Sequence, residues 1–518
     1  MLTNKSLNQN KTFNLFLRTL SIACTFTILA VSAANAQKKQ STRTQLTQQG
    51  QQKNVLLILC DDLRRDMLAY NKSVAQTPNI DALQKQSINF RSACTTTGLC
   101  SPSRAALFTG RLGHRTGLDD NTQLWHSRLL GLDLKQTTLI EWAKQKGYFV
   151  GYFGKWHLGA RGPVRRGADR YSEAGGMEDR EDFGPKPNFE EVKSYDNKKN
   201  VLEKPQYYAV AKGSYNESEP KKEIIDGIQF LQEVNNTAAP FFLTVSFHAP
   251  HPPYKVPRPY DTLYDYTKVV LPASIHDSFY NKPSYQRDVL WPWHYTAHMS
   301  KEDWQKTIAY SWASVTLLDR AIGELLDALK KTGKYDNTLI VFASDQGSML
   351  GDHGLYDKAA YSYDELVRIP MLIKVPGIAP KGIERHVSLI DLNQTLVEWM
   401  GLQPKQLNID SRSLFPLIIN GDKGWNTPDE AFYLYEWYNG SWFGVRTIRT
   451  PDYKYCWNPE GGIDELYDLK KDPHEIQNLV LDSDHKKITE DLQLRLLYHL
   501  KKIQDPLYET MKLVKKMK

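Results

Sequence analysis

The chain has 518 residues, of which 41% are hydrophobic and 24% are charged, and its formal net charge is +7. This composition is typical of a globular protein, and the length predicts a large domain with a smaller companion. The mild positive charge suits an anionic substrate. It does not indicate a nucleic-acid binder, because no arginine-rich run or recognition module accompanies it.

Residues 1–36 have the pattern of a secretory signal peptide. Basic residues precede an apolar run at 20–32, and Ala34-Asn35-Ala36 forms a small-residue cleavage site. The run is short for a membrane span, and Cys24 lies inside it rather than after it, which argues against a lipid anchor. We expect export to the periplasm or beyond, with no stable membrane span. Residues 37–52, rich in Gln, Lys, Thr and Ser, are expected to form a flexible linker.

A continuous apolar run at residues 54–60 predicts a central parallel strand, which ends at Asp61 and Asp62. Open α/β sheets place their ligands at the carboxyl ends of strands. Neighbouring carboxylates repel each other unless a cation neutralises them, and their oxygens suit Ca²⁺ or Mg²⁺. The alternative is a simple strand-to-loop turn with two solvated acids.

Residues 100–111 read Cys-Ser-Pro-Ser-Arg-Ala-Ala-Leu-Phe-Thr-Gly-Arg. Pro102 favours a helix start and Gly110 a helix end. Cys100 and Arg104 are therefore expected near a helix N-terminus, where backbone N–H groups and the helix dipole favour anions. A thiol in that place is expected to have a lowered pKa and to be reactive. The alternative is a helix cap with a buried structural cysteine.

Two further predicted strands end in basic and imidazole groups. After the strand at 148–153, Lys155 and His157 stand two residues apart and would point the same way in extended chain. Such a pair suits an oxyanion and a proton transfer, although a surface loop with a stray histidine is the alternative. After the strand at 240–247, His248 and His251 lie between prolines on a stiff loop. For His248, support of a neighbouring group, lining of a substrate pocket and simple core packing all stay open.

The predicted strand at 337–344 delivers Asp345 and Gln346 to the same edge. Together with the aspartates after residue 60, they would form an oxygen-rich cage for a hard divalent cation. The segment 351–358 follows and contains His353 and Lys358.

These stretches together resemble the type I (formylglycine-dependent) sulfatase family of the alkaline phosphatase superfamily, and within it exported bacterial polysaccharide sulfatases. The resemblance rests on Cys-x-Pro-x-Arg with Thr-Gly-Arg, the Asp-Asp pair, Gly-Lys-Trp-His and Gly-Asp-His-Gly. It implies that Cys100 is converted to formylglycine by a separate generating or anaerobic maturation enzyme. It also implies a bound Ca²⁺, with Mg²⁺ as the alternative.

The resemblance carries over site roles to the matching positions. The implied catalytic residues are Cys100, Arg104, His157 and His251. The implied sulfate-binding residues are Lys155, Lys358 and His353. The implied metal ligands are Asp61, Asp62, Cys100, Asp345 and Gln346. Gln346 departs from the family, which usually has Asn or His there, and is the ligand most in question.

The expected fold is α/β, with a large, mostly parallel sheet sandwiched by helices, as in alkaline phosphatase, and a smaller C-terminal α+β domain. We expect the catalytic domain at 53–424 and the C-terminal subdomain, with a basic helical tail, at 425–518. The segment 161–220 shows no clear period and is expected to be an irregular insertion near the site.

The implied function is that of a sulfuric ester hydrolase acting on a sulfated polysaccharide or oligosaccharide. An algal glycan such as ulvan is favoured over a glycosaminoglycan. The alternatives are a phosphoester or phosphonate hydrolase of the same fold, and an inactive glycan-binding relative.

Overall fold

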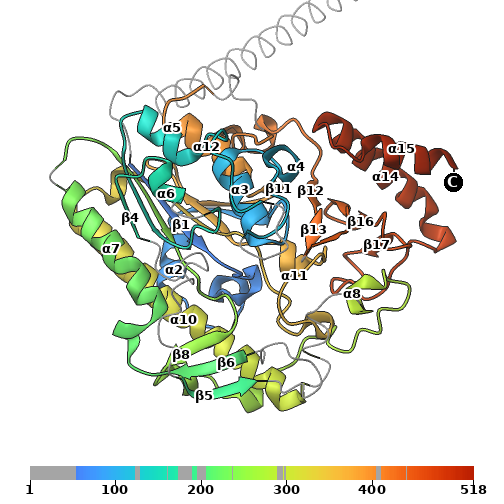
Figure 1. Cartoon of the computed structure of the whole chain (residues 1–518), viewed down its shortest axis with the longest axis horizontal. Helices are drawn as coiled ribbons and strands as arrows, with labels where there is room; N and C mark the ends of the chain where they lie inside the picture. Colours follow the sequence, from blue (N-terminus) through green and yellow to red (C-terminus); the bar gives the residue numbers. More distant parts are fainter. Residues whose placement is uncertain are drawn as a thin grey trace, which may run out of the picture. The chain divides into compact units, whose positions relative to one another are not determined.

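The structure, a computed structural model, is shown in Figure 1. It describes residues 54–122, 129–159, 162–172, 189–194, 206–235, 237–288, 296, 299–403, 410–438 and 440–517. The predicted signal peptide and linker lie outside these residues.

The central feature is an eight-stranded sheet in the order β11-β2-β10-β9-β1-β7-β3-β4. Every neighbouring pair is parallel except those made by β10, which runs antiparallel to both β2 and β9. The strands are β1 (Asn54–Cys60), β2 (Ile88–Cys94), β3 (Phe149–Gly154), β4 (Arg170–Ser172), β7 (Phe241–Ser246), β9 (Thr338–Ser344), β10 (Met371–Lys374) and β11 (Lys381–Ser388).

Helices pack on the sheet in two groups (Figure 1). The first group consists of α2 (Pro78–Gln84), α7 (Glu219–Val234) and α10 (Lys301–Lys331), and the second of α3 (Cys100–Thr109), α5 (Leu139–Gln145) and α12 (Asp391–Trp399). All residues of β1 are buried, and Leu56, Ile58 and Cys60 share one core with the first group. Successive side chains of a strand point to opposite faces, so the alternate apolar residues of β1 face the other layer. A strand covered on both faces explains why its sequence is apolar without interruption.

The segment 161–220 is more regular than predicted. It supplies β4 to the main sheet, and β5 (Phe189–Ser194) and β6 (Gln206–Ala211) to a three-stranded sheet with β8 (Tyr254–Pro257). Arg166 is buried and donates to the carbonyl oxygens of residues 132–136, so its part in the fold is structural. The segment also contains the short helix α6 (Gly162–Arg165).

The other short helices are distributed along the chain: α4 (Gly113–Thr116), α8 (Tyr285–Asp288), α11 (Asp364–Val367) and α13 (Phe415–Asn420).

The C-terminal part is an antiparallel sheet in the order β12-β15-β16-β17 with helices packed on it (Figure 1). Its strands are β12 (Ala431–Leu434), β15 (Arg446–Arg449), β16 (Tyr453–Trp457) and β17 (Glu465–Asp468), beside a small hairpin of β13 (Trp437–Tyr438) and β14 (Ser441–Trp442). The predicted helical tail consists of two helices, α14 (Lys486–Lys502) and α15 (Tyr508–Met517). Pro506 separates them because a proline disfavours helical backbone at the residue before it.

The predicted α/β class, with a mostly parallel sheet and a smaller α+β part, is confirmed. The predicted boundary near residue 424 stays a prediction. In the part of the chain that the structure describes, no helix has both the length and the apolar character needed to cross a membrane.

Candidate active site

The four adjacent strands β9, β1, β7 and β3 end at one level. Cys60 pairs with Ser344, Leu59 with Ser246, and Ser246 in turn with Gly154. The residues that follow these strand ends therefore emerge side by side at the carboxyl edge of the sheet, where α/β proteins bind ligands. This register brings together the Asp61, Lys155, His251 and Asp345 regions from four distant parts of the sequence.

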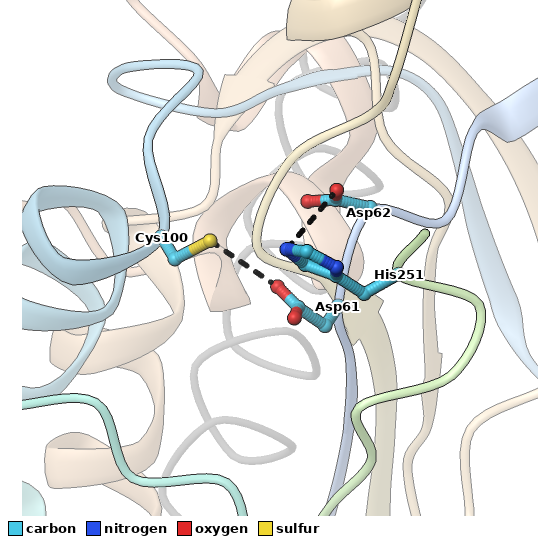
Figure 2. Close-up of side chains that lie close together, drawn as sticks. All are labelled: Asp61, Asp62, Cys100 and His251. Carbon is cyan, nitrogen blue, oxygen red and sulfur yellow. Dashed lines mark hydrogen bonds and ion pairs between the residues drawn. The ribbon is translucent and has the colours of Figure 1, made fainter. Parts of the chain in front are cut away.

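Asp61, Asp62, Cys100 and His251 meet at this edge, as Figure 2 shows. Each offers one potential ligand atom, and these atoms lie within 4.8 Å of one another. The Cys100 thiol donates to Asp61 Oδ1 at 3.4 Å, and His251 Nε2 lies 3.8 Å from Asp62 Oδ2. Asp62 has a left-handed backbone (φ 61°), a costly conformation for a non-glycine residue.

Three cations neutralise this acidic edge. Lys155 Nζ pairs with Asp61 Oδ2, Lys358 Nζ with Asp62 Oδ2 at 2.7 Å, and Arg104 Nε with Asp345 Oδ2 at 2.7 Å. Burial opposes ionisation of Asp61, but the charges of Lys155, Lys358 and Arg104 outweigh it and hold its pKa well below the ordinary value. The edge is thus an array of fixed, alternating charges.

Arg104 is fully buried and is held on two sides. Its Nη1 donates to the carbonyl oxygen of Lys155 (2.9 Å) and to Ser246 Oγ (2.8 Å). Its Nη2 has no hydrogen-bond partner among the described residues and lies 3.9 Å from Asp61 Oδ1. One N–H edge of the guanidinium is therefore available to an anion.

The expectation of a lowered thiol pKa at Cys100 is wrong. Burial, reinforced by the carboxylate of Asp61, raises the pKa of Cys100 to about 12. Cys100 does begin α3, but the free-energy cost of burying a thiolate exceeds the stabilisation that a helix N-terminus gives to a negative charge. The encoded thiol is therefore neutral at physiological pH and is a poor nucleophile as it stands.

The acidic edge fits a divalent cation. Gln346 Nε2 contacts Asp62 Oδ1 and lies 3.0 Å from Cys100 Sγ, while Gln346 Oε1 is buried without a hydrogen-bond partner among the described residues. Turning this amide over would exchange the two atoms and place the oxygen among carboxylates, where a hard cation prefers it. Burial and the Asp61 carboxylate, opposed by Arg104, raise the pKa of Asp345 to about 7, and a cation would remove that repulsion. The longer side chain of Gln346 thus reaches the site despite its departure from the family pattern.

The two predicted catalytic histidines both reach this edge. His251 Nε2 accepts from Lys358 Nζ at 2.7 Å, and burial together with Lys358 lowers the pKa of His251 to about 4. His157 has a left-handed backbone (φ 57°) and a buried Nδ1 without a hydrogen-bond partner among the described residues. Burial and Lys155 hold its pKa well below the ordinary value. Both imidazoles are therefore neutral at pH 7 and able to accept a proton.

His353 makes its contacts elsewhere. Its Nδ1 lies 2.7 Å from Asp277 Oδ2, and its ring stacks on Tyr363 with centroids 3.8 Å apart. Asp277 also pairs with the buried Lys282 at 2.6 Å. The predicted contact of His353 with sulfate stays a prediction, but its observed partners belong to a separate buried polar cluster.

With this geometry in place, comparison with known proteins decides the family. The family described as Sulfatase matches residues 53–402, about two thirds of the chain. The chain belongs to the sulfatase family. Members of this family typically use a divalent metal and a formylglycine. A second family, described as N-sulphoglucosamine sulphohydrolase, C-terminal, matches residues 351–502 of this sulfatase.

Curated relatives align over most of both chains. An N-acetylglucosamine-6-O-sulfatase of Bacteroides thetaiotaomicron is 28% identical over 525 residues, covering 92% of this sulfatase and 89% of the relative. An ulvan-active sulfatase of Formosa agariphila is also 28% identical, over 468 residues, covering 87% and 82%. Among solved structures, a phosphonate monoester hydrolase of Agrobacterium radiobacter superposes with a TM-score of 0.73 at 24% identity, covering 87% and 96%. This last likeness confirms the alkaline phosphatase-like fold.

Sequence reasoning missed several polar residues that organise the site of this sulfatase. Ser246 Oγ accepts from Arg104, Ser103 Oγ donates to the Asp345 carbonyl at 2.7 Å, and Asn121 Oδ1 accepts from the Ser101 N–H at 3.0 Å. Ser246 was detectable because it ends a buried strand at the same edge as the aspartates. Asn121 lies 20 residues from its partner in an irregular segment, and no local pattern marks it.

Proposed function

We propose that this sulfatase removes sulfate from a sulfated polysaccharide or its oligosaccharides, using a formylglycine made from Cys100 and a divalent cation. A sulfated algal glycan such as ulvan is the favoured substrate class. The observation that carries the proposal is the meeting of Asp61, Asp62 and Cys100 with Arg104 and Lys358 at one sheet edge. The similarity to a relative named for ulvan and to one named for N-acetylglucosamine 6-O-sulfate supports a glycan substrate.

Two groups would complete the site. Asp61, Asp62, Asp345, Gln346 and the side chain at position 100 would hold the cation, which supplies positive charge to polarise the ester and to favour an ionised nucleophile. Formylglycine at position 100 would add water at its aldehyde, and a hydroxyl of this hydrate would be the nucleophile in place of the neutral thiol.

The remaining steps belong to groups that the chain itself provides. Arg104 Nη2, Lys155 and Lys358 offer positive charge to the sulfate oxygens in a buried site where such charge acts strongly. Lys358 or His251 would protonate the departing alcohol oxygen. The neutral His251 ring accepts from the Lys358 ammonium at Nε2, so the proton that His251 passes on is one that it takes from Lys358. His157, neutral and with a free nitrogen lone pair, would take a proton at Nδ1 when the nucleophile is regenerated.

A direct experiment tests the proposal. The chain would be co-produced with a maturation enzyme, and peptide mapping by mass spectrometry would identify the residue at position 100. Sulfate release would then be measured across a panel of ulvan, carrageenan, fucan and glycosaminoglycan fragments. We expect an aldehyde at position 100 and turnover that depends on it. An active enzyme with an intact Cys100 thiol would refute the formylglycine assignment, and turnover of glycosaminoglycans alone would refute the algal one.

A phosphonate or phosphoester hydrolase is the second candidate, because the phosphonate monoester hydrolase shares the fold at a TM-score of 0.73. Rates on matched aryl sulfate, aryl phosphate and aryl phosphonate monoesters discriminate between them. The proposal requires the sulfate ester to have the highest kcat/KM.

We also propose that the protein is exported, on the signal-like pattern of residues 1–36. Cell fractionation and N-terminal sequencing of the mature protein test this. Retention of the leader on protein in the cytoplasmic fraction would contradict it.

A further inference from the structure

A buried carboxyl group lies behind the His251 loop. Glu223 is 1% exposed and sits on α7 in line with Gly227, Phe230 and Val234, which occupy the buried face of that helix. An acid at the helical spacing of a buried face is costly to desolvate and needs a partner. Its partner is His248, two residues beyond the end of β7.

Glu223 holds His248 by two atoms. The His248 backbone N–H donates to Glu223 Oε1 at 2.9 Å, and His248 Nδ1 lies 3.0 Å from the same oxygen. A proton on Nδ1 makes His248 a double donor to one acceptor. One carboxyl oxygen thereby fixes both the main chain and the ring of this residue.

The clamp is connected directly to His251. The His251 N–H donates to the His248 carbonyl oxygen at 2.8 Å, closing a turn over Ala249 and Pro250. One residue earlier, the Phe247 N–H donates to the Leu59 carbonyl oxygen at 2.7 Å, which ties the strand end to β1. The backbone from His248 to His251 has little conformational freedom, because the turn is closed by a hydrogen bond and Pro250 fixes its own φ angle. The place where the His251 ring enters the site is therefore set by where His248 is held.

We propose that Glu223 and His248 form a positioning pair that holds His251 in contact with Lys358 and oriented to protonate the departing alcohol. The inference rests on the proposed function, since it assigns His251 the role of general acid. It gives a reason for burying a polar pair where apolar side chains would pack at lower cost. Glu223 Oε2 has no hydrogen-bond partner among the described residues, so the pair is not arranged to satisfy every polar atom. The pair instead holds both the backbone and the ring of His248 in place through Glu223 Oε1.

Leaving-group dependence separates positioning of the acid from general structural damage. 4-Nitrophenolate is a good leaving group and departs with little help from a proton donor. Phenolate is a poorer leaving group, so its departure depends more strongly on protonation. We would compare kcat/KM on 4-nitrophenyl sulfate and phenyl sulfate for the matured wild-type enzyme and for Glu223→Leu, Glu223→Gln and His251→Ala. Glu233→Gln, at an exposed acid on the same helix that pairs with the exposed Arg170, is the matched control. His248→Leu substitutes for Glu223→Leu if that variant does not fold.

Glu223→Leu is expected to lower kcat/KM for phenyl sulfate by roughly tenfold or more, within the about 10²–10⁴-fold that a general acid contributes. The rate on 4-nitrophenyl sulfate should change by less than about threefold. Glu223→Gln, which keeps an oxygen acceptor, should restore most of the loss, and Glu233→Gln should behave as wild type. Equal loss on both esters, or none, would overturn the pair's role.

A crystal structure of Glu223→Leu poses the same question without turnover. The proposal requires the His251–Lys358 contact to be lost or lengthened, and an unchanged contact would overturn it. If the wild-type enzyme hydrolyses no sulfate ester, the proposed function fails on its own, and the crystal structure still decides whether the pair positions His251.

Discussion

Arg104 Nε lies 2.7 Å from Asp345 Oδ2, and this ion pair joins α3 to the residue that follows β9, with both side chains fully buried. It holds the nucleophile helix against the sheet edge that carries the aspartates. Because both charges are removed from water, each depends on the other.

Arg104→Met is expected to lower the free energy of unfolding by about 3–5 kcal/mol, because it removes the cation that is paired with the buried Asp345 carboxyl group. Urea unfolding of the variant measures this. The control is Arg170→Ala, which breaks the exposed pair with Glu233 and should cost at most about 1 kcal/mol. Similar losses for the two variants would contradict the claim that the buried pair is the stronger constraint.

Cation binding should stabilise the fold through the acidic edge. After chelation and dialysis, added Ca²⁺ is expected to raise the melting temperature. At a Ca²⁺ concentration of about one hundred times Kd, the free energy of unfolding should rise by about 2.7 kcal/mol. Asp62→Asn should abolish the shift, while Asp336→Asn, at a side chain 99% exposed, should keep it. A shift with Mg²⁺ alone would assign the smaller cation, and no shift with either would contradict a metal site here.

The thiol of unconverted Cys100 should resist alkylation. In protein produced without a maturation enzyme, a pKa of about 12 leaves almost no thiolate at pH 7.5, and the side chain is buried. Peptide mapping after native iodoacetamide treatment should show Cys100 unlabelled, whereas treatment in denaturant should label it. Rapid native labelling would contradict the raised pKa.

Gly154 is the last residue of β3 and directly precedes Lys155. It has φ +92°, and an added Cβ would lie 2.0 Å from the Ser246 carbonyl oxygen, a backbone atom that cannot move aside. Gly154→Ala is therefore expected to combine roughly 1–2 kcal/mol of backbone strain with about 1–3 kcal/mol of overpacking.

Gly147→Ala is the matched control at the other end of β3, because its φ is +76° but nothing lies within 4 Å of the added atom. Only the strain component should appear in its unfolding free energy. Activity should fall in Gly154→Ala and persist in Gly147→Ala, and equal effects would show that the contact with Ser246 has no consequence.

The Asp277 cluster should make stability depend on acid pH. Burial opposes its charge, but the bonds to His353 and Lys282 lower the pKa of Asp277 to about 2, below the ordinary value of about 3.9. A depressed folded-state pKa contributes stability that is complete above the unfolded pKa and is lost as pH falls through the folded one.

The melting-temperature difference between wild type and Asp277→Asn should therefore be constant above about pH 4 and should shrink between about pH 4 and pH 2. Asp327→Asn, which breaks an exposed pair with Lys330, should show a small difference throughout. A difference that stays constant down to pH 2 would contradict the assignment.

Several elements could be predicted from local pattern alone. The continuous apolar run at 54–60 predicted a central strand, and these residues form β1, which is buried over its whole length. Strand ends also indicated which residues would share a site, because parallel strands deliver their C-terminal neighbours to one edge. The pattern failed at 161–220, where β4, β5 and β6 gain their regularity from pairing with distant strands rather than from their own sequence.

The sequence by itself determined the chemistry of the cluster: which side chains stand at the strand ends, and the motifs that place the chain among the sulfatases. Only the tertiary structure decided their electrostatic state and support. Cys100, expected to be a reactive thiol, is neutral because it is buried beside Asp61. His353 contacts Asp277 and stacks on Tyr363. Glu223 came to hold His248 from 25 residues away. The reason is physical, since desolvation and Coulomb energies depend on the distances between side chains in space, and separation along the chain does not fix those distances.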